Sequence, residues 1–393
     1  MTLFLSRRAA LLGLTGAVTL GRASLAVAAA GTDRRFVVIL LRGALDGMSA
    51  VVPYGDPELA NLRKPLIPAA PGEQNGLLDL GGFYGMHPAL ANAHDLYKSN
   101  EFLIVHAAAG PYRSRSHFEA QDYMEFGADH RLTSGWLNRV AALLPAPAKG
   151  DNALAVGSAM PLLLRGPSRV ATWLPQSFKA PPTELYARIA ALNAHDPVTG
   201  PAIRNGLSER GFTEAVLSGS EQAPNKYAFP ALAAAAGRLL AAEDGPRLAA
   251  LEIGGWDTHT GQANRLTYPL KQLDEGIVAL KQSLGDAWAK TAVVVMTEFG
   301  RTARVNGTGG TDHGTGTVVF VAGGAVAGGR VQADWPGLGA NRLFENRDLQ
   351  PTVDVRAVAK GVLAQHLGLD AAGLAKVFPD SQSASSMRGL VRA

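Results

Sequence analysis

The chain has 393 residues, of which 47% are hydrophobic and 18% are charged, so its length allows roughly one to three domains with a large buried core. The formal net charge is +4, but the first thirty residues carry three arginines and no acid, and without them it is only +1. No basic stripe interleaved with aromatic residues is present, so a nucleic-acid partner is not expected.

Cysteine is absent from the whole chain. This excludes disulfides, a thiolate nucleophile and cysteine metal ligands. A metal site would therefore have to use oxygen and nitrogen ligands, which suits Zn, Mn, Mg or Ca.

The first thirty residues are predicted to be an export signal. Ser6, Arg7 and Arg8 precede an apolar run over 9–20, and small residues with A-x-A cleavage patterns follow. The paired arginines resemble a twin-arginine signal, which the export machinery reads as an address. An ordinary secretory signal is the alternative. We expect export to the periplasm or the extracellular space, a mature domain over 31–393, and no stable membrane span, because no later segment has about 18 consecutive apolar residues.

Five short apolar runs in the mature chain are predicted to be buried strands. They are rich in β-branched residues and continuous rather than alternating, which is typical of a parallel sheet covered on both faces. The runs are 36–41, 102–109, 247–255, 291–296 and 317–324.

Helical patterns alternate with these strands. The predicted helices are 87–100, 116–127, 229–245, 268–286 and 353–368. The alternation predicts an α/β fold, a three-layer doubly wound domain with a mostly parallel sheet. The stretch 146–228 reads as a loop-rich insertion or cap within that single domain.

Polar side chains gather where the predicted strands end, which is the edge where open α/β sheets bind ligands. The glycine-rich run 307–316 precedes the last strand and is expected to be a flexible site loop that reaches this edge only if it folds back. The candidate residues, in chain order, are Arg42, Asp46, Ser114, Arg115, Ser116, His117, Asp257, His259, Glu298, Arg301, Asp312 and His313.

These residue types suit a metal-dependent hydrolase. The metal ligands we expect are Asp46, Asp257, His259, Glu298, Asp312 and His313, holding one or two divalent ions, with zinc expected first and Mn, Mg or Ca as alternatives. A tetrahedral anion would be clamped by Arg42, Arg115 and Arg301. Ser116, Ser114 or a metal-activated water would attack, with His117 beside them.

Each of these residues also has a plain structural interpretation. Asp312 and His313 could simply tie down a loop, and Asp257 with His259 could form an Asx-turn. Asp46 precedes a glycine, as in an ordinary turn. Ser116 suits the N-cap of the helix that follows it.

Several stretches of the chain resemble a bacterial family called domain of unknown function 1501. They are LRGALDGMSAVVPYGDP, GMHPAL, RSHFEAQDYMEFG, GGWDTHTGQ and TEFGRTARVNGTGGTDHGTG. That family is similar, more distantly, to the alkaline phosphatase and sulfatase superfamily. The resemblance implies an alkaline-phosphatase-like fold and hydrolysis of phosphate or sulfate esters.

The resemblance also implies metal roles for matching residues. Asp46 is similar to the first metal aspartate of the superfamily, and His313 to its last metal histidine. Asp257 and His259 resemble its Asp…His pair, although the usual gap is longer. Glu298 lies where an Asp-His pair follows a strand.

Two positions depart from the superfamily pattern. Phe299 lies where the histidine of that pair would be. The nucleophilic Ser or Thr usually lies four residues before a histidine like His117, and that position is Arg113, with Ser114 and Ser116 out of register. These departures weaken the expectation of a second full metal site and of a covalent mechanism.

The sequence therefore predicts an exported, metal-dependent hydrolase of small anionic esters. The alternative is a non-catalytic, degenerate member that acts as a periplasmic or surface binding protein. A secretion-linked structural factor without a ligand is a third possibility, for which the sequence offers only the export signal.

Overall fold

The computed structural model describes residues 33–145, 150–175, 183–193, 196, 199–217 and 228–392. The predicted twin-arginine signal over 1–30 lies outside this part of the chain. Within it, no helix is both long enough and apolar enough to cross a membrane.

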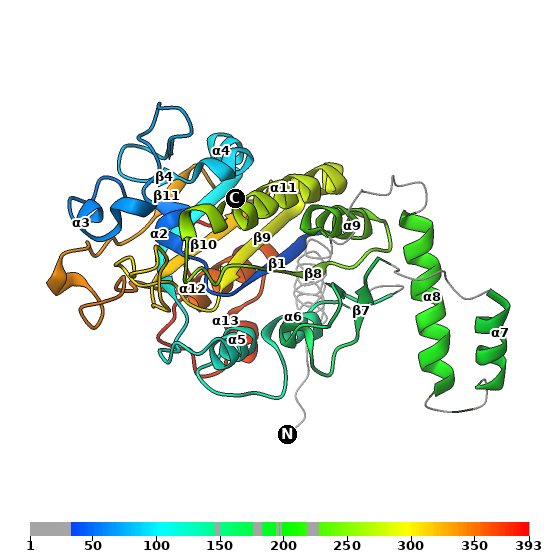
Figure 1. The fold of residues 1–393 in the computed structure, drawn as a ribbon. Coiled ribbons are helices and arrows are strands. Elements are labelled where there is room, and N and C mark those ends of the chain that lie inside the picture. The colour runs from blue at the N-terminus through cyan, green and yellow to red at the C-terminus, as the bar shows by residue number, and fades with distance from the viewer. Residues whose placement is uncertain are drawn as a thin grey trace, which may run out of the picture.

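The centre of the fold is a nine-stranded sheet (Figure 1). All five predicted strands are present in it, with ends shifted by at most a few residues. Its order is β11-β5-β10-β9-β1-β8-β6-β7, and β12 also pairs with β5. The strands are β1 (Arg35–Arg42), β5 (Phe102–Ala109), β6 (Ala153–Val156), β7 (Val170–Trp173), β8 (Leu248–Gly254), β9 (Thr291–Thr297), β10 (Thr317–Ala322), β11 (Arg330–Gln332) and β12 (Val353–Asp354). A second, three-stranded sheet contains β2 (Val51–Val52), β3 (Leu78–Asp79) and β4 (Gly85–Met86).

One strand of the large sheet runs against the others. β1 pairs in parallel with β8 and β9, whereas β10 is antiparallel to both of its neighbours, β9 and β5. The start of β10 therefore lies at the edge where the other strands end. Residues just before β10 reach the carboxyl edge without the folded-back loop that the sequence required.

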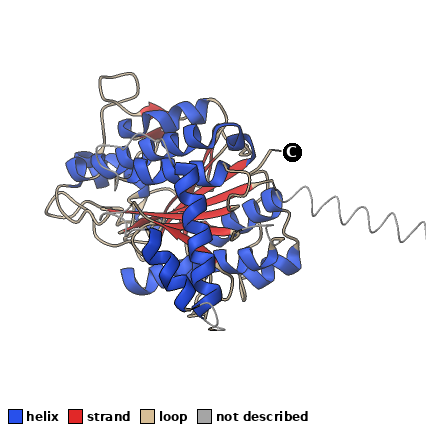
Figure 2. Cartoon of the chain, turned by 90° about the vertical axis from the view of Figure 1, so that its right-hand side faces the viewer, coloured by secondary structure: helices blue, strands red, loops and turns tan. Residues whose placement is uncertain are grey.

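Helices cover both faces of the sheet (Figure 2). Side chains of β1 alternate between two separate cores, Val37 and Ile39 on one face and Phe36 and Val38 on the other, all fully buried, as expected for a strand covered on both sides. The first core includes α4 (Ala91–Lys98), α9 (Phe229–Ala241) and α11 (Thr267–Leu284). The second includes α5 (His117–Phe126), α6 (Trp136–Leu143), α12 (Val355–Leu367) and α13 (Ala371–Val377).

Short helices connect these elements. The α-helical ones are α2 (Gly47–Ala50), α3 (Leu59–Arg63) and α10 (Gln262–Arg265). The 3₁₀ helices are η1 (Lys64–Leu66), η2 (Pro88–Leu90), η3 (Leu162–Leu164), η4 (Gly285–Lys290) and η5 (Ala340–Arg342).

The described part of 146–228, the stretch expected to be a loop-rich insertion or cap, contains both strands and helices. Its strands β6 and β7 extend the large sheet beyond β8 in parallel register, so this portion belongs to the α/β body. Helices α7 (Thr183–Leu192) and α8 (Thr199–Leu217) follow and lie beside that body (Figure 1).

A buried ion pair ties three segments together beneath the carboxyl edge. Asp46, at the start of α2, accepts hydrogen bonds from both terminal nitrogens of Arg63 at the end of α3, one of them at 2.9 Å, and both side chains are only 1% exposed. Ser49 and Gln262 also donate to Asp46. Burial raises the pKa of the Asp46 carboxyl, but Arg63 outweighs it and holds the pKa below its usual value.

We predict that Arg63→Met lowers the free energy of unfolding by about 3–5 kcal/mol, because it leaves a buried carboxylate without its counter-charge. Adding Asp46→Asn should recover part of that loss. Denaturant unfolding of the wild type, the single variant and the double variant measures both effects. A loss below about 1 kcal/mol, or a double variant no more stable than Arg63→Met alone, would contradict the assignment.

Candidate metal centre

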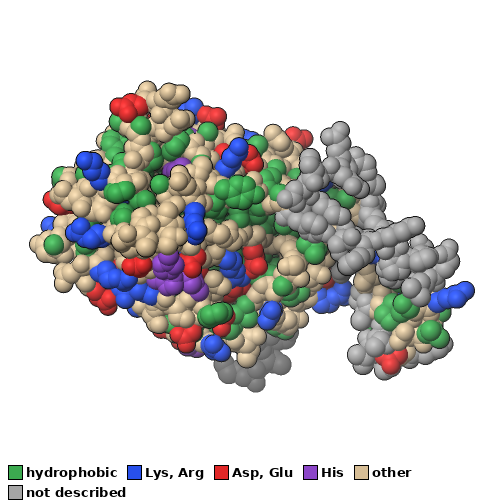
Figure 3. Space-filling model, viewed as in Figure 1, with side chains coloured by type: hydrophobic (Ala, Val, Ile, Leu, Met, Phe, Trp, Pro, Cys, Tyr) green, Lys and Arg blue, Asp and Glu red, His purple; other side chains and the backbone are tan. Residues whose placement is uncertain are grey.

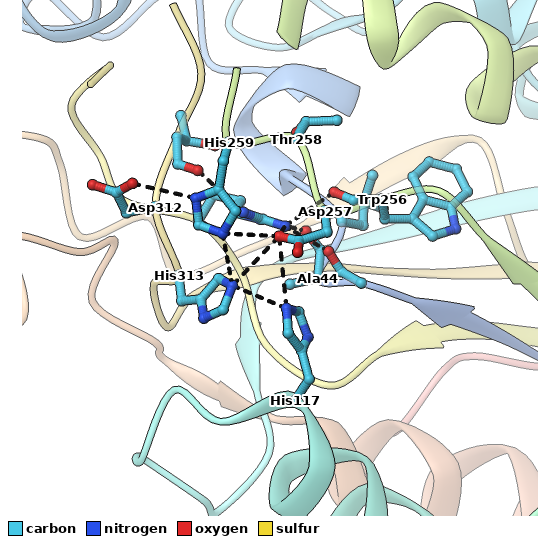
Figure 4. A network of polar contacts seen from close by, with 12 residues as sticks. Ala44, His117, Trp256, Asp257, Thr258, His259, Asp312 and His313 are labelled. Atoms are coloured by element: carbon cyan, nitrogen blue, oxygen red, sulfur yellow. Dashed lines mark hydrogen bonds and ion pairs between the residues drawn. The ribbon is translucent and has the colours of Figure 1, made fainter. Parts of the chain in front are cut away.

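Four side chains from three loops meet at the carboxyl edge of the sheet (Figure 4). His117 is the first residue of α5, in the connection that follows β5. Asp257 and His259 lie in the loop after β8, and His313 lies just before the antiparallel strand β10. The edge itself therefore places all four, since two strands, β5 and β8, end there and β10 begins there.

Nitrogen and oxygen atoms of these side chains lie close together. The Nε2 atom of His313 is 2.9 Å from the Nε2 atoms of both His117 and His259. One carboxylate oxygen of Asp257, Oδ1, lies 3.0 Å from His259 Nε2, 3.4 Å from His313 Nε2 and 3.6 Å from His117 Nε2. Ligands of a tetrahedral zinc ion with bonds near 2.0–2.1 Å are separated by about 3.3 Å, so these spacings match neighbouring ligands of one ion.

Hydrogen bonds at the opposite ring nitrogen orient two of the imidazoles. His117 Nδ1 lies 2.8 Å from a carboxylate oxygen of Glu298, and His313 Nδ1 lies 2.9 Å from the backbone carbonyl of Arg115. Both partners can only accept, so each Nδ1 carries the proton. In the neutral rings, Nε2 then presents a lone pair to the other histidine.

His259 follows the same pattern. Its Nδ1 lies 3.3 Å from a carboxylate oxygen of Asp312, which again places the proton on Nδ1. Three Nε2 lone pairs and one carboxylate oxygen thus face one another. Such an arrangement is repulsive unless a cation lies among the atoms or the rings take up extra protons, and outer hydrogen bonds of this kind are typical of metal-bound histidines.

Glu298, predicted as a ligand, lies behind His117 rather than at the meeting point. Its buried carboxylate accepts hydrogen bonds from Gln121, Thr297 and the backbone of Gly43 as well as from His117. Burial raises the pKa of Glu298, but these donors hold it below its usual value. The bond to Glu298 in turn raises the pKa of His117.

Asp312, also predicted as a ligand, lies behind His259. It accepts a hydrogen bond from Asn306 at 3.1 Å, which lowers its pKa. Part of the glycine-rich run that contains it is closely packed: a Cβ on Gly310 would lie 2.2 Å from the His259 backbone, and one on Gly314 would lie 2.3 Å from Arg301. Only glycine allows this close approach.

Asp46 is separate from the histidine group, because both of its oxygens are bonded to Arg63. The guanidinium therefore supplies the positive charge that a second ion was expected to bring. Within the described residues, one group of His, Asp and Glu side chains has the spacing to hold an ion, namely His117, Asp257 and His313, and His259 adjoins it.

The three predicted anion-binding arginines are bonded to protein groups. Arg42 pairs with Glu125 at 2.6 Å and with Glu252. Arg115 bonds to the buried Asp348 at 2.8 Å and to Glu345.

Arg301 is fully buried and donates to Asp257 Oδ1 at 2.5 Å. Burial raises the pKa of Asp257, but Arg301 lowers it overall. Arg301 thus fixes the orientation of Asp257 instead of facing a substrate. Its other acceptors are the carbonyls of Gly43, Ala44, Trp256 and Thr311.

Neither predicted serine is paired with a base among the described residues. Ser116 is the N-cap of α5, without a side-chain cap bond, and Ser114 is exposed and bonded to Tyr112. The sequence assigned His117 to catalysis, and the structure places its Nε2 atom beside His313 and Asp257. The sequence signal for this location was that His117 follows β5, whose end lies at the carboxyl edge of the sheet. Phe299 stacks on the His117 ring at 4.9 Å and so fills the place expected of a second histidine.

Comparison with solved structures gives distant likenesses. One is the crystal structure titled Ps i-CgsB in complex with k-i-k-neocarrahexaose, at 12% identity and a TM-score of 0.39, covering 90% of this chain and 77% of the other. Another is a phosphonate monoester hydrolase of Agrobacterium radiobacter, at 11% identity and a TM-score of 0.32, covering 86% and 74%. Likenesses this low do not establish an alkaline-phosphatase-like arrangement; the fold stands as a mixed α/β fold with a large, mostly parallel sheet.

No curated protein matches the chain. Residues 104–378, which include every side chain of the histidine group, match the family described as Protein of unknown function (DUF1501). The match covers well over half of the sequence, and the chain therefore belongs to the DUF1501 family.

Proposed function

We propose that the protein binds one divalent metal ion through His117, Asp257, His259 and His313, and that it hydrolyses phosphate or sulfate esters at that ion. One observation supports this most directly. The Nε2 atom of His313 and those of His117 and His259 lie close to one another and to Asp257 Oδ1, with pairwise distances of 2.9–3.6 Å. The outer bonds at each Nδ1 leave those Nε2 atoms free to act as ligands.

The donor set favours zinc. Three imidazole nitrogens and one carboxylate oxygen match the ligand types of catalytic zinc sites, and Mn²⁺ is the next candidate. Magnesium and calcium prefer sites made of oxygen alone. The proposal is therefore one ion of zinc type, not a pair.

The exposure of the group favours catalysis over a purely structural ion. The side chains of Asp257 and His259 are 46% and 41% exposed, and histidine side chains gather at the surface between acidic and basic groups (Figure 3). A bound ion would supply Lewis-acid character and, since zinc sites can expand to five ligands, would also activate a water at neutral pH. Because neither Ser114 nor Ser116, the serines beside the histidine group, is paired with a base in the described residues, we propose direct attack by water rather than a covalent enzyme intermediate.

The surroundings suit an anionic ester. A groove of about 540 Å³ lies on the Asp312 side of the centre and is lined by Arg304 and Arg347. Arg347 also donates to the backbone carbonyl of His313 at 2.9 Å. We propose that these two arginines bind the anion from the groove, in addition to the bonds of Arg347 to Asp348 at 3.3 Å and of Arg304 to the Asn61 carbonyl at 3.4 Å.

Export remains part of this proposal. The paired arginines near the N-terminus support passage through twin-arginine machinery to the periplasm or beyond, where small esters would be met. A non-catalytic binding protein is the second candidate, favoured because neither Ser114 nor Ser116 is paired with a base among the described residues, and it would keep the same ligands.

Protein purified without chelators should contain about one metal ion per chain, measured by inductively coupled plasma mass spectrometry. Asp257→Ala and His313→Ala should each lose it, because each removes a ligand atom. Ser116→Ala is the control and should retain it. Metal-free wild type, or metal that persists in both ligand variants, would contradict the proposal.

Glu298→Gln should weaken metal binding by about 10- to 100-fold, because it removes the charge that orients His117 and makes it more basic. Competition with a chromogenic chelator measures the affinity. The control is Glu119→Gln. Glu119 is an exposed acid in the first turn of α5, the helix that begins with His117, and its replacement should leave the metal affinity unchanged. Equal affinities for the two variants would show that Glu298 has no such role.

A further inference from the structure

A second groove, of about 670 Å³, opens on the other side of the metal centre. Asp257 lies in its wall, so one end of the groove reaches a proposed ligand directly. It is lined by residues from the end of β8 and the loop after it, from α9, from the last residue of α10 and from the first two turns of α11. Its position suits the part of a substrate that projects away from the reacting group.

One wall of this groove is apolar. Phe229 and Leu232 from α9 lie there with Ile253 from β8. The backbone at Gly254 and Gly255 is also part of the lining, and a Cβ on Gly254 would meet nothing within 4 Å. A flat group can therefore approach the backbone without meeting a side chain at Gly254.

Tyr268 adds an exposed aromatic ring to the lining. Its side chain is 66% exposed, which is unusual for so large an apolar surface. Arg265, Tyr268 and Gln272 follow the helical spacing i, i+3 and i+7, which places them on one face of consecutive helices, and all three line the groove. An aromatic ring, a cation and an amide are thus presented together.

The charges of the groove are unbalanced. Glu252 is paired with Arg42, and Asp257 is paired with Arg301. The exposed side chain of Arg265, by contrast, has no hydrogen bond or ion pair with any residue of the described chain. With both acids neutralised, the lining carries one unpaired positive charge.

We propose that this groove binds the organic part of the substrate, a ring with an apolar face that carries a negatively charged substituent. The ring packs against Tyr268 and the apolar wall, and the substituent bonds to Arg265. The inference rests on the proposed function only in placing the reacting ester at Asp257; binding of the ring itself does not require the metal. Aromatic and pyranose rings both have such a face, and the test below separates them.

The test uses four small probes that differ in ring type and in charge: benzoate, benzyl alcohol, glucuronate and glucose. Ligand-observed NMR titration gives the affinity of each for the full chain, as purified and again with a chelator. We expect the charged member of one pair to bind about three- to tenfold more tightly than its neutral partner. The pair that binds identifies the ring as aromatic or pyranose.

Variants then assign the contacts. Arg265→Gln should abolish the preference for the charged probe, whereas Lys271→Gln, an exposed cation on α11 that does not line the groove, should preserve it. Tyr268→Ala should weaken both members of the binding pair by about three- to tenfold, and Tyr268→Phe should not. Circular dichroism checks that each variant is folded.

The inference is overturned if neither ring binds, if the charge preference survives Arg265→Gln, or if Tyr268→Ala binds as the wild type does. Because the titration is read with and without chelator, a protein that lacks metal or turnover can still confirm the groove. A protein that holds metal can equally refute it.

Discussion

The site depends on three hydrogen bonds that fix which nitrogen of each histidine carries its proton. Glu298, Asp312 and the Arg115 carbonyl each accept from an Nδ1 atom, and the three Nε2 atoms are thereby turned toward Asp257. Lone pairs held 2.9 Å apart repel in the absence of a cation. The rings are held by groups outside the cluster, and this arrangement supports our proposal that an ion binds among these atoms.

Two buried arginines provide the rigid base for this cluster. Arg63 neutralises Asp46 beneath the edge, and Arg301 bonds to Asp257 and to four backbone carbonyls. Each lies where the sequence suggested a metal or a substrate anion. In the structure these arginines are part of the fold, and the proposed ligands form one exposed set with a polar groove on one side and a partly apolar groove on the other.

The sequence predicted the strands, and which side chains lie at the carboxyl edge of the sheet, better than it predicted which of those side chains contact one another. Continuous apolar runs identify β1, β5, β8, β9 and β10, and the rule for parallel sheets places Asp257, His259 and His117 correctly. It could not reveal that β10 is antiparallel, since strand direction depends on pairing partners far away in the chain. Nor could it show which of the predicted ligands meet at one point: the structure places Asp46, Glu298 and Asp312 in hydrogen bonds to Arg63, His117 and His259.

The central claim is that three imidazoles and one carboxylate surround a single ion, and X-ray absorption spectroscopy of the purified, metal-containing protein tests it most directly. We predict three nitrogen ligands from imidazole at about 2.0–2.1 Å and one carboxylate oxygen, with no second metal nearby. A coordination shell with fewer than two imidazoles, or a metal–metal distance of about 3.5–4 Å, would contradict this account.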